Sequence, residues 1–271
     1  MTGGLGARVT PDFDKDFLIE VAKGNVPGHS LIHKFGRNTA VGTTMVPISL
    51  GGIYRTPQVA AATTLRVKAG NVNDDASGTG AREVSLEFIN TSGVKVTETL
   101  ATAGTSASSA TSVSAIRLYR FYVSKSGTYA TQSAGSHAAD IVIENSAGGT
   151  DWGTIDVTDF PRGQSEIGVY TIETGYTGYL LSATAFTDSS KTTQLIFFHR
   201  AKILETAAPY SGTMREIVNM TTDSAKVSLE PKSPVDGVFT GPVDLGIMGK
   251  VSATTSEVNV DFELLLVQDG Y

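Results

Sequence analysis

The chain has 271 residues, of which 40% are hydrophobic and 18% are charged, with a formal net charge of -6 at pH 7. These values are typical of a globular protein with a sizeable core, and a negative chain without Lys and Arg clusters disfavours nucleic acid as the partner. Cysteine is absent, which excludes disulfides and thiolate chemistry. No leader-like segment and no apolar run near the roughly 20 residues that span a bilayer are found, so we expect no membrane association.

The chain begins with a glycine-rich stretch, residues 1–11, that we interpret as a flexible arm, and a helix is predicted directly after it. Phe13, Phe17 and Val21 recur every four residues between positions 12 and 23. Leu18 widens this apolar stripe. The pattern is that of a short amphipathic helix whose apolar side needs a partner surface.

The next segment, residues 24–38, reads as a turn, a short strand and another turn because it contains three glycines and Pro27. His29 and His33 lie four residues apart without an acidic neighbour, so we interpret them as polar residues of a docking loop and not as metal ligands. The residues predicted to bind a partner are Phe13, Phe17, Leu18, Val21, His29, His33, Lys34, Phe35 and Arg37.

A loop with several oxygen ligands follows at residues 71–80. Two asparagines and two aspartates between positions 71 and 75 are the kind of side chains that bind calcium. The spacing is not that of an EF-hand loop, and Asn and Asp also favour turns for backbone reasons alone. The turn interpretation is therefore preferred, with calcium as the alternative.

The clearest supersecondary pattern is a hairpin at residues 81–100. Val84, Leu86 and Phe88 alternate with polar residues, a turn ends at Gly93, and the alternation then resumes. This period of two is that of an antiparallel pair with one dry face. A second strand, residues 116–123, carries Arg117 and Arg120, which we expect on the open faces of an edge or interface strand.

The second half of the chain continues in short strands. Residues 195–198, Leu-Ile-Phe-Phe, predict a strand that is covered on both faces. The alternation from Val258 to Leu266 predicts a central core strand near the C-terminus. Short strands without intervening helices predict an all-β fold with two β-sandwich-like domains behind an N-terminal arm with one short helix. The expected boundaries are 1–49, 50–160 and 161–271, and a single large sandwich is the alternative.

No catalytic pattern is found. The chain lacks a GxSxG elbow and a glycine-rich loop followed by a helix, and its four histidines are scattered. Acidic residues such as Glu83, Glu87, Asp261 and Glu263 alternate on expected wet faces, where solvation explains them. We therefore expect a protein that is not an enzyme and has no cofactor and no metal.

Several phrases of the sequence resemble a family of virion structural proteins of tailed bacteriophages. They are DFLIEVAKGNVPGHSLIHKFGRNTAVGT, DDASGTGAREVSLEFIN followed by VTETL, IRLYRFYV, and VDFELLLVQ. The resemblance covers most of the chain, while residues 206–249 match no phrase of the family.

The resemblance implies a structural component of the phage particle, assembled in the host cytoplasm. The first expectation is a capsid decoration, or cement, protein that binds the major capsid protein or another virion protein through its N-terminal arm as a homo-oligomer, with a trimer as one option. The alternative is a neck or tail component, such as an adaptor or a fibre anchor. A second alternative is a carbohydrate-binding module. The aromatic candidates for that role are Tyr119, Tyr122, Trp152, Tyr176 and Tyr179.

Overall fold

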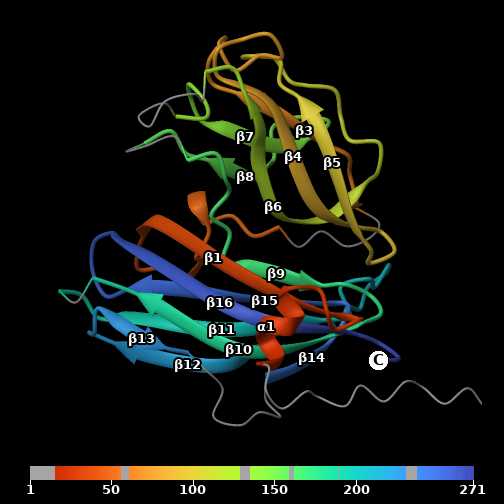
Figure 1. The fold of residues 1–271 in the computed structure, drawn as a ribbon. Helices are drawn as coiled ribbons and strands as arrows, with labels where there is room; N and C mark the ends of the chain where they lie inside the picture. The colour runs from red at the N-terminus through yellow and green to blue at the C-terminus, as the bar shows by residue number, and fades with distance from the viewer. Residues whose placement is uncertain (1–15, 56–60, 129–134, 159–161, 189, 230–236) are drawn as a thin grey trace, which may run out of the picture.

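The computed structural model of the chain describes residues 16–55, 61–128, 135–158, 162–188, 190–229 and 237–271. The prediction of an all-β protein is confirmed: within these residues the helical elements are α1 (Phe17–Ala22) and the 3-10 helix η1 (Leu50–Gly52). Several small antiparallel sheets form two units, a lower and an upper one in Figure 1. No helix of the described part is long and apolar enough to cross a membrane.

The lower unit contains two five-stranded sheets, of which sheet A has the order β1-β16-β10-β13 with β14 also paired to β10. The predicted central strand is confirmed, because β16 lies between β1 and β10 and buries its apolar alternation from Val258 to Leu266. The strands of sheet A are β1 (His29–Val41), β10 (Tyr176–Phe186), β13 (Lys226–Ser228), β14 (Val238–Thr240) and β16 (Ser256–Gln268).

Sheet B has the order β12-β11-β15-β2, and β9 also pairs with β15. On β11, Leu195 and Phe197 belong to the cluster shared with sheet A, while Phe198 belongs to the cluster shared with the upper unit. The prediction of a strand covered on both faces is therefore confirmed. The strands of sheet B are β2 (Val46–Pro47), β9 (Val169–Ile172), β11 (Thr193–Ala201), β12 (Met214–Thr222) and β15 (Val243–Val251).

The upper unit consists of two three-stranded sheets that enclose a second apolar cluster. The predicted hairpin is confirmed: its strands pair from Glu83 opposite Ala101 to Ile89 opposite Lys95, and Gly93 in the turn has φ 76°. The sheets are β3 (Leu65–Ala69), β7 (Ile141–Asn145) and β8 (Asp151–Ile155), and β5 (Lys95–Ala101), β4 (Ala81–Asn90) and β6 (Ala115–Ser126).

The upper unit is an insertion, since its strands lie in sequence between η1 and β9, both of which belong to the lower unit. The segment 24–38, predicted as turn, short strand and turn, instead contributes most of one strand of 13 residues, β1. The reason is its partner: β1 pairs with β16 from His29 opposite Val267 to Val41 opposite Ser256. Local turn signals do not reveal a pairing with so distant a strand.

Candidate functional site

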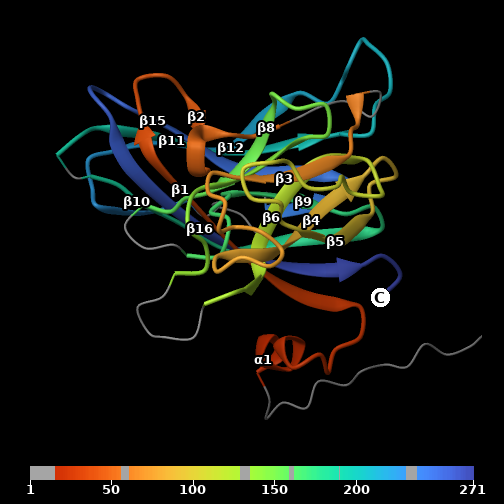
Figure 2. The ribbon, with the colours of Figure 1, turned by 90° about the horizontal axis from the view of Figure 1, so that it is seen from above.

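Helix α1 lies beside β1 at the margin of the lower unit, as Figure 2 shows. Asp16 caps it, since its side chain accepts hydrogen bonds from the backbone N–H of Leu18 at 2.9 Å and of Ile19 at 3.3 Å. Phe17 and Ile19 are 47% and 53% exposed. A six-residue helix gains most of its stability from packing, yet among the described residues α1 leaves these two large apolar side chains exposed.

A groove of about 330 Å³ separates α1 from the outer face of sheet A. Leu18 and Ile19 form its helix side, and Leu31 of β1 and Leu181 of β10 form its sheet side. His33 and Glu263 of neighbouring strands, which lie opposite each other in the register, also line it. The groove is thus apolar with polar groups along one flank, a composition that suits a protein partner.

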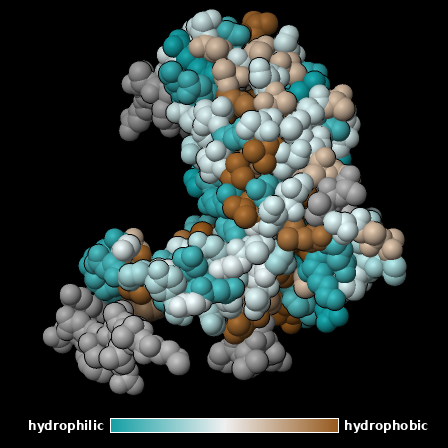
Figure 3. All heavy atoms as spheres, turned by 90° about the vertical axis from the view of Figure 1, so that its right-hand side faces the viewer, coloured by the Kyte–Doolittle hydropathy of each residue, from teal (hydrophilic) through white to brown (hydrophobic). Residues whose placement is uncertain are grey.

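The outer face of sheet A continues this surface beyond the groove. Leu31, Leu265 and Tyr179 lie in one row across β1, β16 and β10. Tyr179 is exposed and Leu265 is half-buried. Figure 3 shows the molecule from the right-hand side of Figure 1, where hydrophilic and hydrophobic residues form a mosaic and the outline is hollowed below the upper unit. We call the exposed side of α1, together with the groove between α1 and sheet A, the α1 surface.

The predicted partner-binding residues divide into two groups. Phe17, Leu18 and His33 are exposed on the α1 surface. Phe17 packs edge-on against His29 at 5.7 Å between ring centroids. The ring of His33 lies 6.0 Å from that of Phe35. Phe13 lies outside the described residues.

The second group is held inside the chain. Val21 is buried, and Lys34 is buried where β1 meets the upper unit, donating a hydrogen bond to the carbonyl of Tyr119. Burial is the main cause that lowers the pKa of Lys34 to about 7, and the charge of Arg120 adds to it. These two residues support the fold and are not available to a partner.

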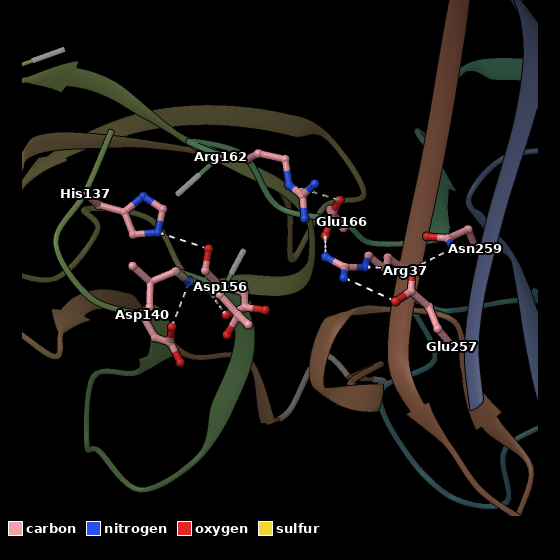
Figure 4. A network of polar contacts seen from close by, with 10 residues as sticks. Arg37, His137, Asp140, Asp156, Arg162, Glu166, Glu257 and Asn259 are labelled. Atoms are coloured by element: carbon pink, nitrogen blue, oxygen red, sulfur yellow. Dashed lines mark hydrogen bonds and ion pairs between the residues drawn. The ribbon is translucent and has the colours of Figure 1, made fainter. Parts of the chain in front are cut away.

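Arg37, also in the predicted set, lies on β1. It contacts both β16 and the segment that links the two units (Figure 4). Its Nε lies 3.1 Å from Oε1 of Glu257, and its Nη1 lies 3.8 Å from Oε2 of Glu166. The hydrogen bond from Arg37 is the largest cause that lowers the pKa of Glu257, whereas burial raises the pKa of Glu166. Arg162 also approaches Glu166, with Nε 3.9 Å from Oε1.

Arg117 was expected on an open face, and this prediction is wrong. Its side chain is 3% exposed and its Nε donates to Oδ2 of Asp244, 2.8 Å away. The hydroxyls of Tyr54 and Thr171 donate to the same carboxylate. Sequence reasoning missed this cluster, although an aspartate within the apolar run of β15 was a signal of a buried charge with a partner.

The candidate calcium loop is organised by backbone hydrogen bonds. Asp74 is fully buried and accepts from the N–H groups of Ala81 and Ala138 at 2.8 Å and of Ala139 at 3.0 Å. Asp75 accepts from the N–H of Ser77 at 3.0 Å. These contacts support the turn interpretation. Within the described residues no group of three His, Asp or Glu side chains could hold a metal ion.

The aromatic candidates for sugar binding are mostly covered. Trp152 is 5% exposed and Tyr119 is 2% exposed, so neither offers a ring face. Tyr122 and Tyr176 are half-buried, and Tyr179 is exposed on sheet A.

Comparison with known proteins assigns no family. No family model matches the chain, and no curated protein matches it. Among solved structures, the Gt strain of infectious bursal disease virus aligns with 12% identity and a TM-score of 0.20, covering 94% of this chain and 79% of the viral chain. The Gx strain aligns with 10% identity and a TM-score of 0.21, covering 90% and 72%. TM-scores this low do not establish a common fold.

Proposed function

We propose that this chain is a non-enzymatic structural protein of a tailed-phage virion, a decoration protein that attaches to the shell through the α1 surface. The single observation that carries the proposal is the apolar side of α1, which is exposed beside a groove that it forms with sheet A. A short helix with this exposure suits a docking element. The sequence resemblance to virion proteins supplies the biological setting.

The proposal also covers the fold, which we describe as two β-sandwiches. Each pair of facing sheets is a β-sandwich, and β1, beside which α1 lies, is a strand of the lower sandwich. Phe17, Leu18 and His33 are the predicted residues that contact the partner, joined by Ile19, Leu31 and Leu181. The partner is the major capsid protein or another virion protein, and the decorating form is a homo-oligomer.

The test combines particle imaging with two full-length variants. Ile19→Asp places a charge on the exposed side of α1, and Val94→Asp is the matched control, because Val94 is 49% exposed in the hairpin turn of the upper unit. Ile19→Asp is expected to abolish attachment to particles that lack this chain, whereas Val94→Asp retains it. Cryo-electron microscopy of wild-type particles is expected to show the chain on the shell with α1 facing the capsid protein.

Density at the portal vertex or the tail would instead support the neck or tail alternative. Equal attachment of the two variants would overturn the α1 surface as the docking element.

A further inference from the structure

A second groove lies on the upper unit, away from α1. It has a volume of about 580 Å³ and follows the C-terminal half of β6, where the segment 162–165 runs beside the strand. Tyr122 pairs with Gln164 in an antiparallel bridge, and the N–H of Val123 donates to the carbonyl of Gly163 at 2.8 Å. Backbone hydrogen bonding between β6 and the segment 162–165 therefore holds together the two segments that line the groove.

Its lining is basic in a chain that is acidic overall. Arg120, Lys125 and Arg162 line the groove, and the described residues that line it include no acidic side chain. Each cation has a carboxylate partner, but in every pair the cation is the more exposed member. The side-chain exposures are 52% for Arg120 against 12% for Glu87, 58% for Lys125 against 38% for Glu83, and 41% for Arg162 against 14% for Glu166.

This asymmetry decides the charge that a ligand meets. The carboxylates of Glu87 and Glu166 lie deeper, where they orient the guanidinium groups of Arg120 and Arg162. The cationic ends remain at the surface, where they can donate further hydrogen bonds to an anion. The groove is therefore suited to an anionic ligand.

The other side chains that line this groove indicate which class of anionic ligand it can bind. The guanidinium of Arg120 lies over the ring of Tyr122, 4.9 Å from its centroid, so this ring face is already covered. Proteins that bind single-stranded nucleic acid combine cations with open aromatic faces on which bases stack. A peptide needs apolar anchors, and Val123 is the only aliphatic side chain among the described lining residues. Hydroxyl and amide groups supply the rest: Ser124, Ser126, Ser136 and Gln164.

We propose that this groove binds an anionic saccharide, with the cations on its carboxylate or sulfate groups and the serine and glutamine side chains beside its hydroxyls. This proposal does not rest on the proposed virion role.

Calorimetry with the full chain tests the proposal. The probes are a galacturonate oligosaccharide, a heparin oligosaccharide and neutral dextran at equal sugar concentration. At least one anionic probe is expected to bind and dextran is not, and the better probe distinguishes carboxylate from sulfate recognition. Arg162→Gln and Lys125→Gln are each expected to weaken binding by roughly tenfold, the value of one lost charge-assisted hydrogen bond.

The variants are chosen to fold. Glu166 keeps Arg37 when Arg162 is changed, and Glu83 is partly solvated when Lys125 is changed. Arg215→Gln is the matched control, because Arg215 is an exposed arginine on β12 in the lower unit. It is expected to bind within twofold of wild type.

Three results would overturn the proposal. They are no binding of either anionic oligosaccharide, equal losses for the groove variants and Arg215→Gln, and equal binding of a single-stranded oligothymidylate with the same losses. The last result would make the groove a general polyanion site. Circular dichroism of each variant checks that the fold is retained.

Discussion

Arg117 and Asp244 form a buried ion pair 2.8 Å long although 127 residues separate them in the chain. Arg117 belongs to β6 of the upper unit and Asp244 to β15 of the lower unit. Desolvation by burial is the largest single cause and lowers the pKa of the Arg117 guanidinium, but Asp244 and Tyr54 together outweigh it, so that the pKa is raised. The pair therefore holds the two units in one arrangement.

The first prediction concerns this pair. Asp244→Ala is expected to lower the free energy of unfolding by about 3–5 kcal/mol, because it leaves the Arg117 charge buried without a partner. Urea denaturation measures the change. Asp223→Ala is the control, since Asp223 is exposed after β12 and its loss is expected to cost less than about 0.5 kcal/mol. Equal effects of the two changes would contradict the role of the pair.

Lys34 predicts a pH dependence of stability. The unfolded chain holds the proton of this side chain up to about its ordinary pKa of 10.5, whereas the folded chain releases it near a pKa of about 7. Stability from this group therefore rises with pH between those values, by an amount on the order of 5 kcal/mol. The groups that act on Lys34 are Arg120 and Lys95, which lower its pKa, and Glu87, which raises it.

Lys34→Met removes this titration and keeps the stem packed. Denaturation of wild type and variant at several values between pH 7 and 9.5 is expected to show the advantage of the variant shrinking as pH rises. A difference that stays constant over this interval would show that Lys34 does not change its charge there.

Asp74 makes a prediction about metal addition and about mutation. Its carboxylate oxygens are occupied by three backbone N–H groups, so calcium chloride is expected to leave Tm unchanged. Asp74→Ala is expected to cost about 3 kcal/mol or more, because the three buried donors lose their acceptor. Calorimetric scans with calcium and with a chelator measure the effect of the metal on Tm. Scans of the variant measure the cost of the mutation. A Tm that increases with calcium concentration would restore the metal interpretation of this loop.

Gly36 lies where β1 passes very close to the backbone of two other segments, so this position should not tolerate a side chain. A Cβ at this position would overlap the backbone of Ile48 and of Gly168, so Gly36→Ala is expected to cost about 3 kcal/mol or more. Gly42→Ala is the matched control, because nothing lies within 4 Å of a Cβ placed there. Its expected cost is less than about 1 kcal/mol, and equal costs would contradict the close approach.

Asp16 predicts that attachment and global stability can be separated. Asp16→Ala removes the N-cap of α1, which is expected to cost about 1 kcal/mol of helix stability. Amide exchange within α1 should accelerate and attachment to particles should weaken, while the urea midpoint of the body stays constant. Lys23→Ala at the other end of the helix is the control. A shift of the midpoint as large as the local effect would mean that α1 belongs to the cooperative core.

Local patterns predicted the elements whose period is visible in a few residues. The hairpin at 81–100 and the alternation of β16 are two such cases, because side chains on one strand must alternate wherever one face is buried. A helix was also predicted from the apolar stripe at residues 12–23; in the described residues α1 begins at Phe17, with Asp16 as its N-cap.

The features that the sequence did not reveal depend on contacts between residues that are distant in the chain. Arg117 looked like a surface residue because its carboxylate belongs to β15, and β1 looked like a loop because its neighbour is the last strand. Lys34 and Val21 were grouped with the docking residues because the contacts that bury them are not visible in the local pattern. Leu181, which lines the groove opposite α1, was missed because it belongs to β10, which is distant from α1 in the chain.

The pairing of β1 with β16 has a consequence for synthesis on the ribosome. The sheet side of the α1 groove needs β1, β10 and β16 together, and β16 ends at Gln268 near the C-terminus. A nascent or prematurely terminated chain therefore has the helix but no platform to place it against. On the proposed function, competence to attach would arise only once β16 has been synthesised, so that products ending before Ser256 are expected not to bind.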